Sequence, residues 1–425
     1  MNREQYLAES TRVELFSARG YQLVIGVICM MAISSPQYVW TLFTAPLTEK
    51  LGVSLAQVQI TFSLLIILQT FFSPVQGYLV DRFGIRTLVG LGCALSGLSW
   101  ILASQASSLS MLYLSYGVVG GLGTGIVYVG IIGLMVRWFP DRRGLAAGAV
   151  AAGYGMGAMI TTFPISNSLK SAGMETTMLT FGLALGLVGR VASRFLRQPP
   201  TSQSDDPLPK TKQIVVDVPP REVLKTPVFW LMFAMFTMMS TSGLMVTSQM
   251  ASFAEDFGMT SVMVMGMAAL PLALTIDRIC NGLTRPLFGW ISDRYGRENT
   301  MAFAFFFEGI AMTLWLLTSD NPVLFVLLSG VVFLGWGEIF SLFPSTLTDT
   351  FGTRHATTNY GFLYMAQGIG SIFGGPVAAL LHQSTDSWYP VFAVAISFDI
   401  ITAGLAFFVL KRMRANWIAK HAMKS

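Results

Sequence analysis

The stretch that decides the fold occurs twice, as "SPVQGYLVDRFGIRT" at residues 73–87 and as "RPLFGWISDRYGREN" at residues 285–299. The two copies begin 212 residues apart in a chain of 425 residues, an offset of half the chain. Residues that recur at the same spacing are Pro74 and Pro286, Gly77 and Gly289, Asp81 and Asp293, Arg82 and Arg294, and Gly84 and Gly296. A repeat at this distance indicates two structurally equivalent halves.

The composition around these stretches is that of a membrane protein. Hydrophobic residues make up 53% of the chain and charged residues 12%, whereas soluble domains carry about 25% charged residues. Apolar runs near the length of about 20 residues that a bilayer requires recur along the chain. We therefore expect an all-α, multi-pass membrane protein. The net charge of +5 does not point to nucleic acid, because cytoplasmic loops of such proteins are rich in Lys and Arg.

Twelve transmembrane spans are expected from the apolar runs. They are 21–45, 55–80, 87–105, 110–136, 144–168, 175–196, 227–254, 260–291, 299–318, 322–347, 357–382 and 386–410. Residues 197–226 are rich in Pro, Ser and charge, so they read as a polar linker. The predicted organisation is a segment 1–20, a six-helix bundle 21–196, the linker 197–226, a six-helix bundle 227–410 and a tail 411–425.

The charges of the loops predict the orientation. Lys and Arg residues gather in the loops on the side that holds both termini, including Lys210 and Lys212 of the linker, while the other side holds Lys50 and Lys170. Both termini are therefore expected in the cytoplasm. The first apolar run is longer than the core of a signal peptide, so we expect it to stay as a helix.

The loop motif G-x-x-x-D-R-x-G resembles the signature of the major facilitator superfamily. Longer stretches resemble the oxalate–formate antiporter family, and they are "SSPQYVWTLF" (34–43), "RWFPDRRGLAAGAVAAGYGMG" (137–157), "NGLTRPLFGWISDRYGR" (281–297), "SLFPSTLTDTFG" (341–352) and "NYGFLYMAQGIGSIFGG" (359–375). The resemblance implies a secondary transporter of small carboxylates that works by alternating access in a bacterial cytoplasmic membrane. A monomer is expected to function alone, without a cofactor.

An enzyme is not indicated by the sequence. The three histidines lie outside the expected spans or at their edges, no H-E-x-x-H motif occurs, and the three cysteines have no metal-binding spacing. We therefore expect no catalytic residues and no metal site. No G-x-x-x-x-G-K-[ST] sequence is present, which argues against an ATP-driven pump.

Arg285 is the strongest candidate for a substrate ligand. It lies eight residues before Asp293, about 12 Å along a helix and therefore near the middle of the membrane. A charge there costs about 2.5–3.5 kcal/mol, and a guanidinium matches a carboxylate with two parallel hydrogen bonds. The alternative is a structural ion pair with an acidic residue near mid-span, and the candidates are Glu308, Glu338 and Asp399. The resemblance places the family's substrate arginine on Arg285.

A second arginine, Arg278, lies two turns from Arg285 on the same helical face and nearer the outer side. For Arg278 and its neighbour Asp277, a role in an outer gate or in pairing across the bundle is expected rather than direct substrate contact.

The resemblance also implies other pocket residues, namely Gln37, Tyr38, Tyr128, Tyr154, Trp336 and Tyr364. The family's second cationic residue falls on Gln367, and one of its tyrosines falls on Phe340. Three explanations stay open: Arg278 supplies the second charge, the substrate is a monocarboxylate, or aromatic hydroxyls help to bind a dianion. Antiport of the oxalate:formate type is expected, and proton-coupled symport of monocarboxylates is the alternative.

Two further roles are expected of charged residues. Proton coupling would require a titrating carboxyl near the site, and Glu338, Glu308 and Asp399 are the candidates. Glu338 is of most interest, because it could pair with Arg285 until an anion displaces it. The repeated loops are expected to make contacts in one conformation and break them in the other, through Asp81, Arg82, Asp293 and Arg294.

Overall fold

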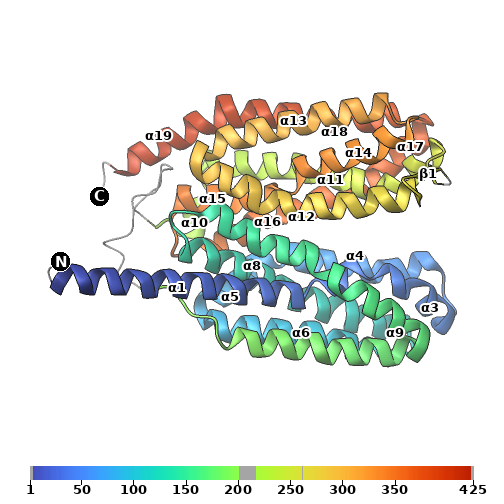
Figure 1. Ribbon diagram of the computed structural model, residues 1–425, viewed down its shortest axis with the longest axis horizontal. Helices are drawn as coiled ribbons and strands as arrows, with labels where there is room; N and C mark the ends of the chain where they lie inside the picture. Colours follow the sequence, from blue (N-terminus) through green and yellow to red (C-terminus); the bar gives the residue numbers. More distant parts are fainter. Residues whose placement is uncertain (1–2, 201–216, 261, 423–425) are drawn as a thin grey trace.

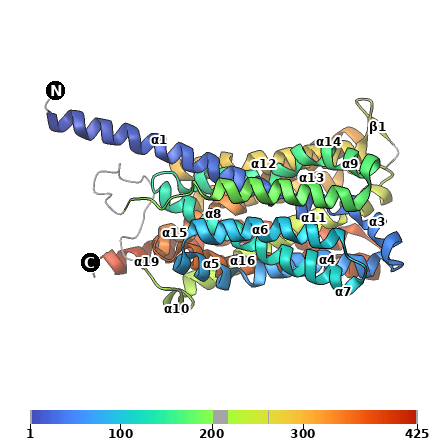
Figure 2. The same cartoon turned by 90° about the horizontal axis from the view of Figure 1, so that it is seen from below.

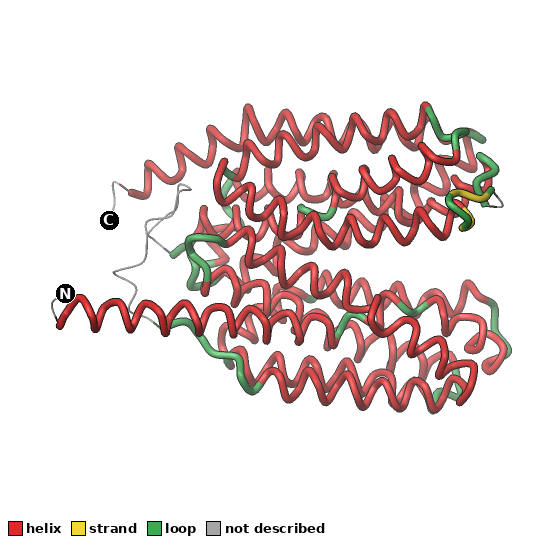
Figure 3. Tube along the Cα trace, viewed as in Figure 1, coloured by secondary structure: helices red, strands yellow, loops and turns green. Residues whose placement is uncertain are grey.

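The computed structural model describes residues 3–200, 217–260 and 262–422, and these residues are almost entirely helical (Figure 3). In this part of the chain nine helices are long and apolar enough to cross a membrane. The number rises to ten if the bent pair α4 (Leu55–Phe71) and α5 (Ser73–Phe83) forms one span. Most of the expected linker, residues 201–216 with Lys210 and Lys212, lies outside the described residues.

The first half of the chain forms α1 to α9. Besides α4 and α5, its elements are α1 (Arg3–Ala32), α2 (Ser35–Tyr38), α3 (Thr41–Leu51), α6 (Ile85–Ser104), α7 (Leu109–Leu112), η1 (Tyr113–Val119), α8 (Gly120–Trp138) and α9 (Arg143–Ser193). Helix α9 covers two expected spans. Gly173, with φ 80° and ψ 172°, breaks the helix between them. Only glycine adopts this backbone conformation without strain.

The second half forms α10 to α19. Its elements are α10 (Pro220–Val223), α11 (Pro227–Asp256), β1 (Met263–Val264), β2 (Met267–Ala268), α12 (Ala269–Tyr295), α13 (Arg297–Leu317), α14 (Pro322–Trp336), α15 (Ile339–Phe351), α16 (Ala356–Ile372), η2 (Phe373–Val377), α17 (Ala378–Thr385), α18 (Trp388–Gly404), η3 (Leu405–Leu410) and α19 (Lys411–Ala422). Helix α12 is long enough to span a membrane, but it carries Asp277, Arg278 and Arg285 and is not among the nine apolar helices.

One expected boundary is wrong, and two helices extend beyond the expected spans. The span expected from residue 260 begins only at Ala269, because an antiparallel β1–β2 hairpin precedes it and its turn residues Met265 and Gly266 have positive φ. The first apolar span begins at Ala18, close to the expected residue 21, and α1 extends ahead of it to Arg3, while α19 continues the last helix to Ala422. Both terminal helices extend beyond the bundles at the same end of the molecule (Figure 1).

The helices form two bundles that lie side by side, one from each half of the chain (Figures 1 and 2). The bundles meet through α9 against α12, α5 against α16 and α15 against α9. A substantial group of polar residues is buried along these contacts, whereas many large apolar side chains on the outer helix faces are exposed. This distribution suits a protein surrounded by lipid.

The repeated motif sits where the bundles touch. A Cβ atom on Gly77 of α5 would lie 2.6 Å from the Thr357 carbonyl oxygen of α16, and one on Gly289 of α12 would lie 2.2 Å from the Gly144 carbonyl oxygen of α9. Any larger residue would therefore push the helices apart, because small residues are what allow helix backbones to approach this closely. The two glycines that match in sequence thus make equivalent contacts between the halves.

Candidate functional site: a cavity between the two bundles

The end of the molecule that holds the termini is closed by the aspartates of the repeat. Asp293, at the end of α12, accepts hydrogen bonds from the Gly144 and Leu145 amides of α9 at 3.0 and 2.9 Å. Asp81, at the end of α5, accepts from the Thr358 amide of α16 at 3.1 Å and from its hydroxyl at 2.7 Å. Each carboxylate therefore binds the positive first turn of a helix in the opposite half.

Arginines strengthen this closure. Arg143 of α9 reaches Asp349 of α15 at 2.5 Å, and Arg297 of α13 contacts Asp349 at 2.8 Å and Asp293 at 2.5 Å. All four side chains of this network are nearly or fully buried. On the other side Arg137 pairs with Asp81 and donates to the Thr353 carbonyl at 3.0 Å. These contacts form two discrete sets of bonds that hold the halves together.

The two arginines that recur in both copies of the motif, Arg82 and Arg294, make other contacts. Arg82 donates to the Tyr78 hydroxyl at 2.9 Å on its own helix, and Arg294 lies over the ring of Trp290 at 4.6 Å. The expected switch role of Asp81 and Asp293 thus has a geometric basis, whereas that of Arg82 and Arg294 has none in this conformation. Sequence reasoning missed Arg137 and Asp349 as members of the network.

A cavity of about 220 Å³ lies between the bundles. It is lined by Gln37, Tyr38, Tyr128, Tyr154, Gly155, Leu244, Thr247, Met250, Leu274, Asp277, Arg278, Asn281, Arg285, Phe333, Trp336, Phe340, Tyr364 and Gln367. All eight residues expected to bind substrate are in this set. The volume is below the roughly 300–1,000 Å³ of pockets for drug-sized ligands, so the cavity suits a small molecule.

The lining runs from the middle of the molecule toward the end away from the termini. Leu274 lies in the second turn of α12, and Met250 lies about two turns before the end of α11. Arg285 lies at the inner limit of the cavity. Beyond it, the contacts of Asp81 and Asp293 close the space between the two bundles. The cavity therefore extends toward one end only in this conformation.

Arg285 is buried, with 2% of its surface exposed, and it bridges the two halves. Its Nη1 donates to the Ala151 carbonyl of α9 at 2.7 Å, and its Nη2 donates to Asn281 Oδ1 at 2.7 Å. Its guanidinium carbon lies 4.6 Å from the centre of the Phe340 ring. Among the described residues it makes no ion pair within 4 Å, so its charge faces the cavity with neutral partners.

Glycine at position 148 permits this placement. A Cβ atom there would lie 2.2 Å from the Arg285 carbonyl oxygen, so α9 and α12 approach to backbone contact beneath the guanidinium. The approach places the Ala151 carbonyl within hydrogen-bond distance of the arginine. A larger residue at position 148 would separate the helices.

Four tyrosines form one wall of the cavity. The Tyr128 ring stacks on Tyr364 at 4.8 Å and meets Tyr154 edge-on at 5.1 Å, and Tyr38 meets Tyr154 at 5.5 Å. The Tyr154 hydroxyl donates to Gln37 Oε1 at 2.5 Å. The tyrosine edges give the cavity a rigid, partly polar wall.

Gln69 of α4 connects this wall across the two halves. Its amide donates to the hydroxyls of Tyr154, at 3.2 Å, and Tyr364, at 3.4 Å. The side chain is 1% exposed. Sequence reasoning missed Gln69 and Asn281, because an amide in an apolar helix gives no signal of which distant side chain it will meet.

Gln367 and Trp336 complete the lining. Gln367 is on the cavity surface and its Oε1 has no hydrogen-bond partner among the described residues. Trp336 donates its indole N–H to the Met239 carbonyl at 3.1 Å, so its ring is fixed against α11. The position at which a second cation was expected therefore presents a neutral amide with a free acceptor.

Arg278 and Asp277 line the outer part of the same cavity. Arg278 is exposed to it, whereas Asp277 is 2% exposed and its carboxyl oxygens have no hydrogen-bond partner in the described part of the chain. The two side chains form no ion pair within 4 Å. Arg278 thus carries a second positive charge that faces the same space as Arg285.

The alternative of an ion pair between Arg285 and Glu338 is not found among the described residues, and neither is a pair of Arg285 with Glu308 or Asp399. All three carboxyls are fully buried, and within the part of the chain that the structure describes their oxygens have no hydrogen-bond partner. Instead of an acidic side chain, Arg285 binds a carbonyl and an amide oxygen. The correction follows from packing, because Glu308, Glu338 and Asp399 lie inside the second bundle and do not line the cavity.

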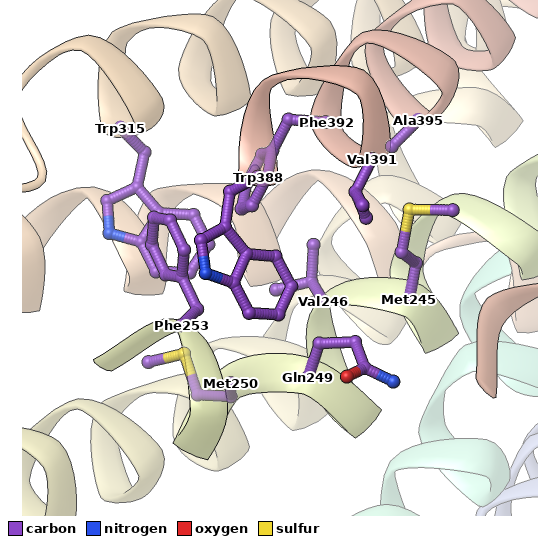
Figure 4. Close-up of a pocket in the computed structure, with 10 residues that line it drawn as sticks. All are labelled: Met245, Val246, Gln249, Met250, Phe253, Trp315, Trp388, Val391, Phe392 and Ala395. Atoms are coloured by element: carbon purple, nitrogen blue, oxygen red, sulfur yellow. The ribbon is translucent and has the colours of Figure 1, made fainter. Parts of the chain in front are cut away.

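A second pocket, in the outer part of the second bundle, is unsuited to a charged ligand (Figure 4). Its volume of about 10 Å³ holds at most one water molecule. Its walls are the aromatic rings of Phe253, Trp315, Trp388 and Phe392 with aliphatic neighbours, and Gln249 is its one amide. The cavity at Arg285 is therefore the candidate site.

Comparison with known proteins agrees with this architecture. A model of the Major Facilitator Superfamily matches residues 23–278 and 272–421. The structure of the proton:xylose symporter XylE superimposes with a TM-score of 0.68 over 94% of this chain and 99% of that chain, at 12% identity. At that identity the likeness shows the fold alone.

Similarity in sequence extends over most of the chain. An oxalate:formate antiporter of Oxalobacter formigenes is 34% identical over 403 residues, which cover 94% of this chain and 93% of that one. Monocarboxylate transporter 13 of Bos taurus is 26% identical over 359 residues, covering 82% and 79% of the two chains. The chain belongs to the Major Facilitator Superfamily, a family of transporters rather than enzymes.

Proposed function

We propose that this protein exchanges small carboxylate anions across a bacterial cytoplasmic membrane, by antiport of the oxalate:formate type, with Arg285 as the anion receptor. The observation that carries the proposal is the buried guanidinium, which faces a small cavity and has neutral partners. A buried cation without a counter-charge is costly, so the site favours an anion that completes it. The similarity to an oxalate:formate antiporter over 94% of the chain supports the same substrate class.

The cavity suits a flat, small anion. Two guanidinium nitrogens can donate to one carboxylate, and the tyrosines that line the same cavity offer hydroxyl groups. We infer that Tyr38, Tyr128, Tyr154 and Tyr364 contact the substrate, with Gln37, Trp336 and Gln367 beside them. In this arrangement Arg278 can supply the second charge for a dianion.

The contacts at the closed end indicate which conformational change transport would require. If both termini lie in the cytoplasm, as the loop charges predict, this conformation would be outward-facing, because the aspartate and arginine contacts close the end that holds the termini. Transport would require these contacts to break and the opposite ends of α11 and α12 to close over the substrate. The two conformations are then discrete sets of bonds, as alternating access requires.

Proton-coupled symport of a monocarboxylate is the second candidate, and one observation favours it. Gln367 is neutral, so a single formate or lactate charge would be matched by Arg285 alone. The similarity to a monocarboxylate transporter is in keeping with this alternative.

The test is counterflow into proteoliposomes of the purified chain, preloaded with unlabelled oxalate or formate and supplied with labelled oxalate outside. Accumulation of labelled oxalate that depends on either internal anion supports antiport of the proposed type. Absence of oxalate exchange, together with uptake of labelled formate or lactate, would replace antiport by the monocarboxylate alternative. Absence of transport for all three anions would contradict both.

Gln367→Lys is expected to shift selectivity toward the dianion. The amide lines the cavity, so an ammonium there would add a positive charge to those of Arg285 and Arg278. We expect the ratio of oxalate to formate affinity to rise about tenfold or more, which corresponds to 1.4 kcal/mol. Competition of each unlabelled anion against labelled exchange measures the ratio. An unchanged ratio, with Gln367→Met as the neutral control, would place Gln367 outside the substrate's reach.

Asn281→Asp is expected to weaken anion binding about tenfold or more, because it places a carboxylate 2.7 Å from the Arg285 guanidinium and neutralises the receptor. Asn281→Leu removes the hydrogen bond without adding a charge, so a smaller loss is expected. The half-maximal oxalate concentration for exchange distinguishes the two. Equal losses in both variants would show that orientation of Arg285, and not its free charge, matters at this position.

A further inference from the structure

A pocket apart from the substrate cavity lies at the end of the molecule that holds the termini, where α12 ends and α13 and α19 begin (Figure 1). Its volume is about 320 Å³, within the roughly 300–1,000 Å³ of pockets that hold small ligands. Four of its ten lining residues are cationic, namely Arg294, Arg297, Lys411 and Arg414, and Glu298 is acidic. This excess of positive charge favours an anionic ligand.

Two of the four cations are buried and already neutralised. Arg297 pairs with Asp293 and Asp349 of the closing network. Arg414 pairs with Glu298 at the start of α13. These two arginines form the buried side of the pocket, and they leave its uncompensated charge to Arg294 and Lys411.

Arg294 and Lys411 are the exposed cations of the pocket. The Arg294 guanidinium carbon lies 4.6 Å from the centre of the Trp290 ring, one turn earlier on α12. The Lys411 Nζ lies 5.0 Å from the centre of the Phe407 ring and donates to Asn299 Oδ1 at 2.9 Å. Within the described part of the chain neither cation forms an ion pair within 4 Å. The pocket therefore presents two positive charges whose partners are neutral.

The position of the pocket along its helices places it at the membrane surface. Arg294 and Lys411 follow directly on the expected spans that end at residues 291 and 410. Trp290 and Phe407 lie inside those spans, and their rings are 39% and 46% exposed on the outer faces of the helices. Aromatic rings at the ends of spans face the lipid interface, and cations one turn further reach the headgroups. The two free cations therefore lie at headgroup level.

We propose that this pocket binds the phosphate group of an anionic phospholipid, held between Arg294 and Lys411, on the side of the membrane that holds the termini. An arginine offers a phosphate two parallel hydrogen bonds, and a lysine adds a point charge. Basic pockets between transmembrane helices bind lipid headgroups in this way. A soluble phosphate has the same charge, but the exposed rings of Trp290 and Phe407 favour a ligand that carries acyl chains. The inference does not depend on the anion site at Arg285.

Native mass spectrometry of the full chain, released from detergent micelles, tests the proposal. Dioleoylphosphatidylglycerol is titrated, and dioleoylphosphatidylcholine, which has no net charge, is the reference lipid. The first phosphatidylglycerol is expected to bind the wild type at least about tenfold more tightly than phosphatidylcholine. The double variant Arg294→Gln with Lys411→Gln should lose this preference, because it removes both free cations of the pocket.

The matched control is the double variant Arg82→Gln with Arg412→Gln. It removes the same number of charges, because Arg82 is the counterpart of Arg294 in the first copy of the motif and Arg412 follows Lys411. Both are exposed and neither lines the pocket, so the preference should stay. An equal loss in both double variants would show attraction to the net charge alone and would overturn the proposal.

A competition experiment distinguishes the lipid from a soluble phosphate. Ammonium phosphate, at the concentration of the lipid, replaces ammonium acetate at equal ionic strength. The phosphatidylglycerol adduct is expected to be equally abundant in both salts. Its loss in phosphate alone would assign the pocket to soluble phosphate and overturn the lipid assignment.

A second measurement uses the wild type alone and needs no variant to fold. Phosphatidylglycerol with a photoreactive group in its headgroup is incorporated into proteoliposomes, and the crosslinked peptides are mapped. Crosslinks should concentrate in residues 290–299 and 407–418, and more strongly than with the matching phosphatidylcholine probe. Crosslinking spread evenly over the helices, or no preference for phosphatidylglycerol, would overturn the proposal. Neither binding nor crosslinking requires transport, so a failure of the proposed anion exchange would leave both results unchanged.

Discussion

Arg285→Gln is expected to reduce the exchange of labelled oxalate or formate at least about 100-fold, a loss of roughly 2.7 kcal/mol. Removal of one partner from a buried charged pair costs about 3–5 kcal/mol, because the other charge is left uncompensated. Glutamine keeps a hydrogen-bond donor but no charge, so the anion would then be the uncompensated group. Initial rates of counterflow, normalised to the amount of folded protein in the liposomes, measure the effect.

Two variants control this result. Arg285→Lys keeps the charge but loses the planar pair of donors, so an intermediate loss of about tenfold is expected. Arg278→Gln removes the same residue type from the same cavity, about two helical turns away, and should impair oxalate more than formate. If Arg278→Gln abolished exchange of both anions and Arg285→Gln did not, the receptor would be Arg278.

Asp349→Asn is expected to open the end of the molecule that holds the termini. Asp349 is fully buried and pairs with Arg143 of the first half and Arg297 of the second. Without its charge both arginines stay buried with fewer partners, at a cost of about 3 kcal/mol or more to this conformation. A shift of that size changes the ratio of the two conformations by more than about 100-fold.

Distances between spin labels at Arg142 and Arg354 measure the shift, since these two exposed residues lie in the closing loops of opposite halves. A cysteine-free background is needed, in which Cys29, Cys93 and Cys280 are replaced. Wild type should give one short distance, and Asp349→Asn a major population at a longer one. Glu298→Gln breaks an ion pair with Arg414 within the second half and should leave the distance unchanged. An unchanged distribution in Asp349→Asn would show that other contacts suffice for closure.

The closing contacts also explain why the motif occurs twice. Asp81 and Asp293 each bind the first turn of a helix in the other half, and Gly77 and Gly289 each allow the backbones to touch. The repeat therefore encodes two equivalent sets of contacts between the halves, one from each copy of the motif. Their arginine partners differ, because Arg137 pairs with Asp81 from the adjacent helix, whereas Asp293 is held by Arg297.

The class of the protein and its division into halves could be predicted from the sequence alone. Both depend on local properties: apolar length decides what crosses a membrane, and a repeat at half the chain length needs no knowledge of contacts. Arg285 could also be named from the sequence as a candidate functional residue, because a charge in an apolar helix is conspicuous wherever its partners lie. The substrate roles of Arg285 and the tyrosines remain predictions, although the structure gathers them around one cavity.

Which side chains meet could be learned only from the folded chain. Asp349 is 206 residues from Arg143, and Gln69 is 295 residues from Tyr364, so no local pattern relates them. The same holds for Glu338 and Arg285. Both lie near mid-span, so the sequence left an ion pair between them open, and the folded chain keeps them apart. The charge balance of a buried group depends on atoms within a few ångströms, and the packing of helices from both halves alone determines which atoms those are.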